Sequence, residues 1–204
     1  SSGLVGRSIS TRLVDHGHYV HHVTNQTVPN YTEAASGLER REFIAGFEPE
    51  KIEETCKKIG VPEIMIHAGW GGMTDPESQV HLGENVENSF KLMSTLYRLG
   101  LKKFIFLGSI NEYGQRGGRL SEEMEPGGKL RNYELGKRQV GELGNKESEK
   151  WGAVYIHVRL ANTFGAPQRP GSLIGTLHQA YANNVPAQLS ACEDYRDYIH
   201  TSEV

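Results

Sequence analysis

The sequence contains little cysteine, no long apolar run and no excess of charge of one sign. Its two cysteines, Cys56 and Cys192, lack a C-x-x-C partner, which argues against a disulfide framework and indicates a reduced, cytoplasmic compartment. No run approaches the roughly 18 consecutive apolar residues that predict a transmembrane helix, and the start of the sequence does not read as a signal peptide. A net charge of −3 over 204 residues gives no support for a nucleic-acid or membrane partner.

Short apolar runs alternate with longer amphipathic stretches along the chain. The runs are typical of buried parallel strands, and the stretches repeat their apolar residues at helical spacing. Strand–helix alternation of this kind predicts a doubly wound α/β fold, with a parallel sheet covered by helices on both faces. The expected strands are 19–23, 64–68, 103–107 and 153–158, the expected helices are 4–16, 49–59, 85–99 and 133–150, and the expected surface loops are 115–128 and 168–172.

The two ends of the chain are unusual for this fold. A helix is expected within a few residues of Ser1 with no strand before it. At the other end, an apolar run at Tyr198 and Ile199 begins shortly before the last residue, Val204. We therefore expect this sequence to be a fragment of a longer chain, or the ordered part of one.

Glycine is abundant, with 24 residues, and two glycines open the first expected helix. Gly3 and Gly6 are spaced as in a dinucleotide site, where glycine lets the backbone approach a pyrophosphate. The helix N-terminus then offers free N–H groups to the phosphates. On its own the pair fits a glycine-rich linker equally well.

A tyrosine and a lysine lie one helical turn apart in the expected helix 133–150. Tyr133 and Lys137 share a helix face, and we expect the ammonium group to lower the pKa of the phenol toward values useful for acid–base work. Ser109 directly follows the expected strand 103–107, at the carboxyl edge where α/β sheets bind ligands. This placement gives weight to a Tyr–Lys pair that chance alone could supply.

Taken together, these motifs resemble the extended short-chain dehydrogenase/reductase family, which includes nucleotide-sugar epimerases, reductases and dehydratases. The resemblance covers nearly the whole chain and implies a Rossmann domain at 1–160 without its first strand. Residues 161–204 would begin a substrate-binding region that is mostly missing at the C-terminus. The segments that carry the resemblance are the glycine turn, 66–69, 85–86, 109–114, 133–137, 159–166 and 196–200.

The resemblance also implies roles for individual residues. Tyr133 would exchange a proton with a sugar oxygen, Lys137 would lower its pKa and hold the nicotinamide ribose, and Ser109 would hydrogen-bond the reacting oxygen. Asn111 and Glu112 are expected either to contact substrate or merely to shape their turn. The expected cofactor-binding residues are Gly3, Leu4, Gly6, Arg7, Thr24, Asn25, Ala68, Gly69, Tyr133 and Lys137, and the expected substrate-binding residues are Asn111, Glu112, Asn162 and Arg196.

Two departures from the family pattern narrow the reaction. Ile110 and Asn111 stand where the dehydratases carry an acidic pair, so we do not expect dehydration. Thr24 and Asn25 stand where NAD-dependent relatives carry an acid, and Arg7 could pair with a 2′-phosphate, so NADP is favoured over NAD. The resulting hypothesis is a 4-keto-6-deoxyhexose reductase acting on a nucleotide-sugar. The alternatives are a 4-epimerase and a catalytically silent cofactor-binding scaffold or redox sensor.

Other features have two interpretations each. Four histidines at 16, 18, 21 and 22 suggest a metal cluster, but no cysteine or carboxylate completes a ligand set, so no metal is expected. Trp70 could stack on a ligand or pack on the sheet edge. Gly136 and Gly141 indicate either a frayed helix or close passage of the cofactor or sheet. By analogy with the family, helices 85–99 and 133–150 would form a homodimer through a four-helix bundle.

Overall fold

The computed structural model describes residues 3–24, 39–43, 46–166, 168, 171–191, 193 and 195–204, and only the backbone of residues 24 and 39–43. Asn25 and Cys192 lie outside the described residues, as does the side chain of Thr24. The helices are α1 (Leu4–Asp15), α2 (Pro49–Ile59), α3 (Glu84–Arg98), α4 (Asn132–Trp151) and α5 (Leu173–Ala182), with short 3₁₀ helices η1 (Gln79–His81), η2 (Ile110–Tyr113) and η3 (Thr201–Glu203). The strands are β1 (Val20–Thr24), β2 (Glu39–Phe43), β3 (Ile64–His67), β4 (Lys103–Leu107), β5 (Val154–Val158), β6 (Asn162–Phe164) and β7 (Tyr198–His200).

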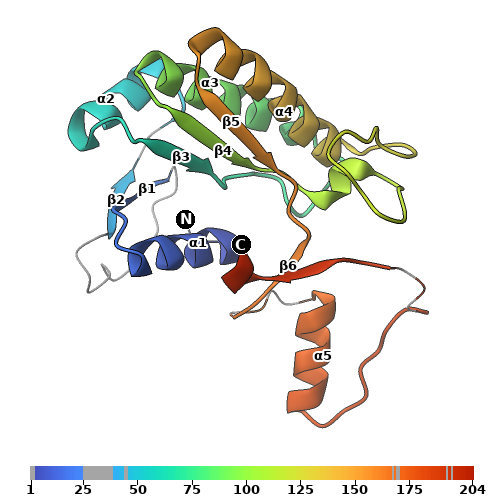
Figure 1. The fold of residues 1–204 in the computed structure, drawn as a ribbon. Helices are drawn as coiled ribbons and strands as arrows, with labels where there is room; N and C mark the ends of the chain where they lie inside the picture. The colour runs from blue at the N-terminus through green and yellow to red at the C-terminus, as the bar shows by residue number, and fades with distance from the viewer. Residues whose placement is uncertain are drawn as a thin grey trace.

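The centre of the fold is a parallel sheet in the order β3-β4-β5, so the predicted α/β class is confirmed. Alternate residues of β4 point to one face, where Phe104 and Phe106 are fully buried. Met93 of α3 and Val140 of α4 pack on that face with them and are also fully buried. In Figure 1, α2, α3 and α4 lie on this side of the strands and α1 lies on the other. The carboxyl ends of these strands form the edge that the site occupies.

The described strands form separate groups rather than one continuous sheet. β1 pairs with β2 and β6 pairs with β7, both in parallel, and neither pair is hydrogen-bonded to the central sheet. Within the described residues, no strand pairs with both β1 and β3. On the face of the central sheet opposite α3 and α4, the side chains of Ile64 and Val154 are about half exposed, at 48% each.

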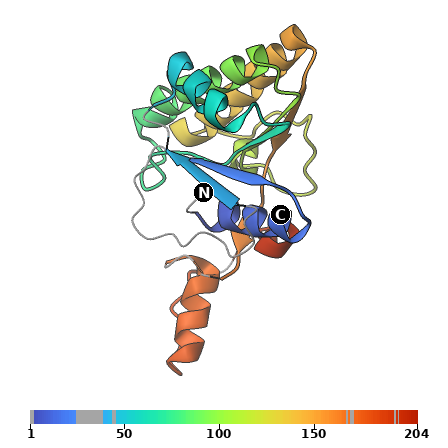
Figure 2. The ribbon, with the colours of Figure 1, turned by 90° about the vertical axis from the view of Figure 1, so that its left-hand side faces the viewer.

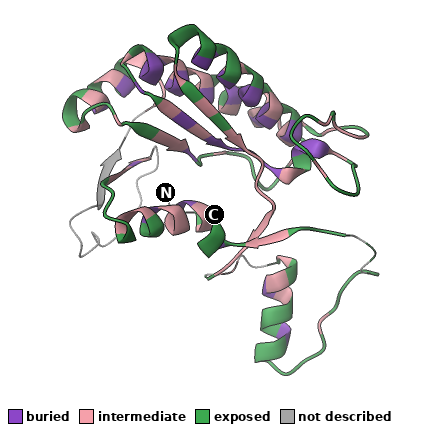
Figure 3. Ribbon diagram, viewed as in Figure 1, coloured by how far each residue is buried: buried purple, intermediate pink, exposed green. Residues whose placement is uncertain are grey.

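Sequence periodicity missed β2, β6 and α5. The sequence of β2 is Glu-Arg-Arg-Glu-Phe, which lacks the apolar run by which strands are recognised. α5 begins at a capping residue, Ser172, whose hydroxyl accepts a hydrogen bond from the Gly175 N–H. Figure 2 shows α5 extending away from the rest of the fold, and Figure 3 shows that much of its surface is exposed.

Glycines on α4 let this helix pack closely, and the helix is not frayed. A Cβ atom at Gly136 would lie 2.2 Å from the backbone oxygen of His81. One at Gly141 would lie 2.4 Å from the His157 Nδ1, and one at Gly144 would lie 2.2 Å from the Tyr155 ring. Gly141 thus passes close to strand β5, as one of its two interpretations held, whereas Gly136 passes close to η1, which is neither the cofactor nor the sheet that was expected there.

Candidate active site

Ser109 is held at the end of β4 by a reciprocal cap on η2. Its hydroxyl accepts a hydrogen bond from the Asn111 N–H at 3.2 Å, and the Glu112 carboxylate accepts one from the Ser109 N–H at 2.7 Å. This capping box fixes the backbone on both sides of the serine. Ser109 is itself buried, at 9% exposure, so its hydroxyl is held in a defined position.

Tyr133 lies in the first turn of α4, and its phenol is close to the Ser109 side chain. The pKa of Tyr133 is raised above its ordinary value, mainly because burial disfavours the phenolate. The nearby Ser109 side chain acts in the opposite direction, and the Glu112 carboxylate raises the pKa further. The expectation that Lys137 lowers this pKa is therefore wrong for the protein in this state. The reason is that burial of the phenol is the largest effect on this pKa, while the Lys137 Nζ lies 5.9 Å from the centre of the Tyr133 ring.

Lys137 is almost completely buried, at 5% exposure, and its Nζ donates a hydrogen bond to the Leu107 carbonyl oxygen at 2.7 Å. Burial lowers the pKa of Lys137 to about 7, and the nearby Glu112 carboxylate opposes this effect. The lysine thus lies beneath the strand end that carries Ser109. Near neutral pH it changes between its charged and uncharged forms.

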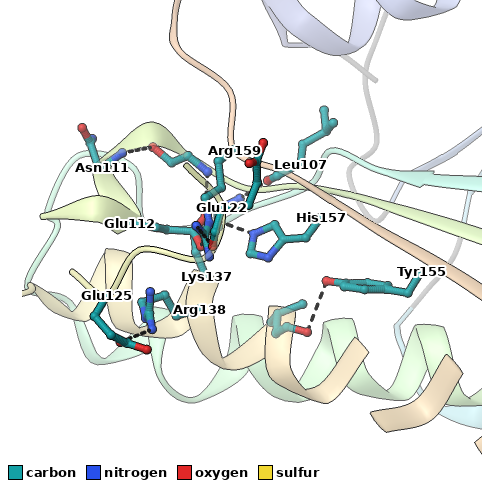
Figure 4. A network of polar contacts seen from close by, with 12 residues as sticks. Leu107, Asn111, Glu112, Glu122, Glu125, Lys137, Arg138, Tyr155, His157 and Arg159 are labelled. Carbon is teal, nitrogen blue, oxygen red and sulfur yellow. Dashed lines mark hydrogen bonds and ion pairs between the residues drawn. The ribbon is translucent and has the colours of Figure 1, made fainter. Parts of the chain in front are cut away.

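Glu112 is the centre of a buried polar network, drawn in Figure 4. Its side chain has no exposed surface, its Oε1 lies 3.2 Å from the His157 Nε2, and its Oε2 lies 3.7 Å from the Arg159 Nε. Because the carboxylate is enclosed, the prediction that Glu112 contacts substrate does not fit this structure. Its contact with the Ser109 N–H matches the other interpretation, that it shapes the turn.

Sequence analysis missed a partner of Tyr133 on η1. His81 is fully buried, and its ring packs edge-on to Tyr133 with 5.4 Å between the ring centres. The Trp70 indole N–H donates a hydrogen bond to the His81 Nδ1 at 3.0 Å, and the planes of the two rings are nearly parallel, with 8° between them. No local pattern marks His81, because its importance comes from the packing of η1 against α4.

A pocket of about 220 Å³ lies beside Tyr133 and is the natural place for a reacting group. Asn111, a predicted substrate-binding residue, lines this pocket. The complete lining is Met73, Pro76, His81, Asn111, Arg131 and Tyr133. Within the part of the chain that the structure describes, this lining includes no carboxylate, in keeping with the absence of the dehydratase acidic pair.

The predicted substrate residues Asn162 and Arg196 lie at the start of β6 and shortly before β7, respectively. Asn162 begins β6, and its Nδ2 donates to the backbone oxygen of Asp197 at 3.0 Å, next to Arg196. The pairing of β6 with β7 brings these segments together over a long sequence separation. Neither residue lines the pocket beside Tyr133.

The predicted cofactor residues fall into several places. Gly3 caps the N-terminus of α1, where a Cβ would meet no atom within 4 Å, while Gly6 is buried in the same helix. Ala68 and Gly69 are exposed directly after β3. Leu4 and Arg7 line a different pocket of about 350 Å³, together with Ala166 and Ser202. They do not line the pocket beside Tyr133, so that pocket does not support their predicted role in cofactor binding.

Comparison with known proteins gives a consistent family. The model of the NAD dependent epimerase/dehydratase family matches residues 1–204. The fold is similar to that of a putative epimerase from Burkholderia cenocepacia J2315, with 19% sequence identity and a TM-score of 0.83 over 99% of this chain and 65% of that one. No curated protein matches the sequence.

Two further solved structures have the same fold. The UDP-N-acetylglucosamine 4-epimerase from Bacillus cereus is 16% identical with a TM-score of 0.77, over 99% of this chain and 68% of that one. The UDP-glucose 4-epimerase from Thermotoga maritima, solved with UDP-glucose, is 20% identical with a TM-score of 0.77 over the same shares of the two chains. The chain thus spans about two thirds of the length of these proteins.

Among the described residues, no helix is long and apolar enough to cross a membrane.

Proposed function

Because the chain belongs to the NAD-dependent epimerase/dehydratase family, we propose that it carries the acid–base site of an oxidoreductase acting on a nucleotide-sugar, with Tyr133 as the proton donor. The observation that carries the proposal is that Ser109 and Tyr133 lie close together beside a pocket at the carboxyl edge of the sheet. Lys137, one turn further along α4, completes the group.

The described residues fit a dinucleotide at this edge. The N-terminus of α1 presents an uncrowded glycine, Gly3, and the exposed backbone at Ala68 and Gly69 follows β3. Backbone N–H groups at a helix N-terminus are suited to a pyrophosphate. When bound, a nicotinamide cofactor would supply or accept a hydride. Gly3, Ala68, Gly69 and Lys137 are the residues that would hold it.

The first candidate reaction is the reduction of a 4-keto-6-deoxyhexose. A phenol with a raised pKa stays protonated at neutral pH, so Tyr133 starts as an acid and can give its proton to a carbonyl oxygen. The Ser109 hydroxyl would hydrogen-bond the same oxygen and stabilise the charge that develops on it. Among the residues that the structure describes, the pocket lining holds no carboxylate of the kind that would remove water from the sugar.

The second candidate is a 4-epimerase, favoured by the solved relatives that are UDP-sugar 4-epimerases. Tyr133 would then first take a proton from a sugar hydroxyl and later return it.

NADP remains our proposal for the cofactor, because Thr24 stands at the position where NAD-dependent relatives carry an acidic residue. The relatives solved with NAD make NAD the alternative. A homodimer through α3 and α4 is also proposed, and light scattering on the purified protein would test it.

Nicotinamide fluorescence and product analysis test this proposal together. We expect the protein to bind NADPH and to oxidise it when a 4-keto-6-deoxy nucleotide-sugar is added. Interconversion of two 4-epimers with no net oxidation would instead establish the epimerase. Tyr133→Phe serves as the control, since it removes only the phenolic hydroxyl and keeps the ring. Binding of cofactor with equal behaviour of the wild type and this variant would leave only the silent scaffold, and no binding of either cofactor would overturn the proposal.

A further inference from the structure

The surroundings of the Lys137 ammonium group are unusual for a buried charge. The Nζ lies 4.2 Å from the centre of the Trp70 ring and 4.7 Å from the centre of the Phe106 ring. Its one hydrogen bond among the described contacts is to the Leu107 carbonyl oxygen, at 2.7 Å. Two aromatic faces and one carbonyl therefore replace most of the water that the ammonium group loses on burial.

The Trp70 ring is held in place by His81. The indole N–H donates to the His81 Nδ1, so this nitrogen is an acceptor and the proton resides on Nε2. The Nε2 lies 2.9 Å from the Asp75 backbone oxygen, to which it donates. Gly72 and Gly136 enclose the histidine, since a Cβ at either one would lie close to its ring or backbone. His81 is therefore a neutral ring of one tautomer that fixes the plane of Trp70.

Other ionisable groups near Lys137 do not replace these aromatic contacts. From β3, His67 has its pKa lowered to about 3 by burial and by Lys137, so it is neutral at working pH. From η2, the Glu112 carboxylate raises the pKa of Lys137, yet its Oε1 is engaged by the Ser109 N–H and His157. Tyr133, on the same helix as Lys137, is a protonated phenol. The ring faces thus make the direct contact with the cation.

We propose that Trp70 is a positioning residue of this site, whose ring face holds the charged form of Lys137 in place while His81 fixes the ring. The proposal rests on the proposed function in one respect only, that Lys137 serves Tyr133 and the cofactor. It assigns Trp70 to packing within the protein, beneath the reacting groups, rather than to stacking on a ligand.

The pKa of Lys137 can be measured directly by NMR, using lysine labelled with ¹³C at Cε and the Lys137→Arg variant to identify the signal. We expect Trp70→Leu to lower this pKa by about one pH unit, because a desolvated cation–π contact contributes roughly that much. Trp70→Phe keeps an aromatic face and should retain most of the wild-type value. Trp151→Leu is the matched control, since Trp151 contacts Lys150 at the exposed end of α4, with 5.3 Å between the Nζ and the ring centre.

Two measurements can contradict the inference. If Trp70 only excludes water, the smaller leucine admits solvent, and the pKa of Lys137 then stays unchanged or rises toward 10.5. Should Trp70→Leu fail to fold, His81→Phe tests the same arrangement through the partner that holds the Trp70 ring. In His81→Phe the indole N–H of Trp70 loses its acceptor, so we expect faster hydrogen exchange at this one of the two tryptophans. Unchanged exchange would contradict the role of His81.

This titration requires no cofactor. Failure of the proposed function would appear as absent NADPH and NADH binding by the wild-type protein, while the effect of Trp70 on Lys137 would still be measurable. Failure of the inference would appear as an unchanged Lys137 pKa in a protein that still binds cofactor.

Discussion

Gly136→Ala tests whether the close approach of α4 to η1 supports the site. The added Cβ would lie 2.2 Å from the His81 backbone oxygen, whereas ordinary contacts begin at 3.4 Å, so one backbone must move by about 1 Å. Such overpacking costs about 1–3 kcal/mol, and a clash with a backbone oxygen, which no side-chain rotation relieves, belongs in the upper part of that range, at about 2–3 kcal/mol. Alanine has a higher helix propensity than glycine, which offsets up to about 1 kcal/mol of this cost. We therefore expect a net loss of stability of about 1–2 kcal/mol.

Thermal unfolding followed by circular dichroism measures this loss. For a chain of this length, a loss of 1–2 kcal/mol corresponds to a fall in Tm of roughly 2–8 °C. Asn145→Ala is the control, because Asn145 is exposed on the same helix, and it should change stability by no more than about 0.5 kcal/mol. An equal or higher Tm for Gly136→Ala would refute the reasoning, since it would mean that η1 yields freely and does not fix His81 beside Tyr133.

Three further predictions concern the site. Tyr133→Phe should lower turnover by about 10²–10⁴-fold and leave the cofactor Kd unchanged, as steady-state kinetics and fluorescence titration would show. Burial lowers the pKa of Lys137 to about 7, so between pH 7 and 10.5 the unfolded chain binds more protons than the folded one. The free energy of unfolding should therefore rise with pH over this range. Urea unfolding should show a smaller rise for Lys137→Met. His67, with its pKa lowered to about 3, should make stability fall as pH drops from 6.5 toward 3, less so in His67→Asn.

The sequence predicted those parts of the fold that depend on local pattern. The apolar run at 103–107 coincides with β4, and its alternate residues Phe104 and Phe106 are buried in the core. The expected helix 49–59 has the bounds of α2, where a proline favours the start. Ser109 and Tyr133 were predicted from their order along the chain, and the structure brings them close together.

The rest depends on contacts between distant segments. β2 is a strand because it pairs with β1, although its residues are mostly charged. The expected lowering of the Tyr133 pKa considered the spacing to Lys137 and could not include burial, which is the larger effect. The enclosure of Glu112 likewise arises only when η2 packs against β5, and Trp70 meets His81 only through the fold of the connection between β3 and α3.

The most direct test of the central claim is a single-turnover reaction with excess protein, NADPH and a 4-keto-6-deoxy nucleotide-sugar, comparing the wild type with Tyr133→Phe. We expect the wild type to oxidise NADPH and reduce the sugar, and the variant to bind NADPH without oxidising it. Oxidation of NADPH at the same rate in both proteins would contradict the assignment of Tyr133 as the proton donor.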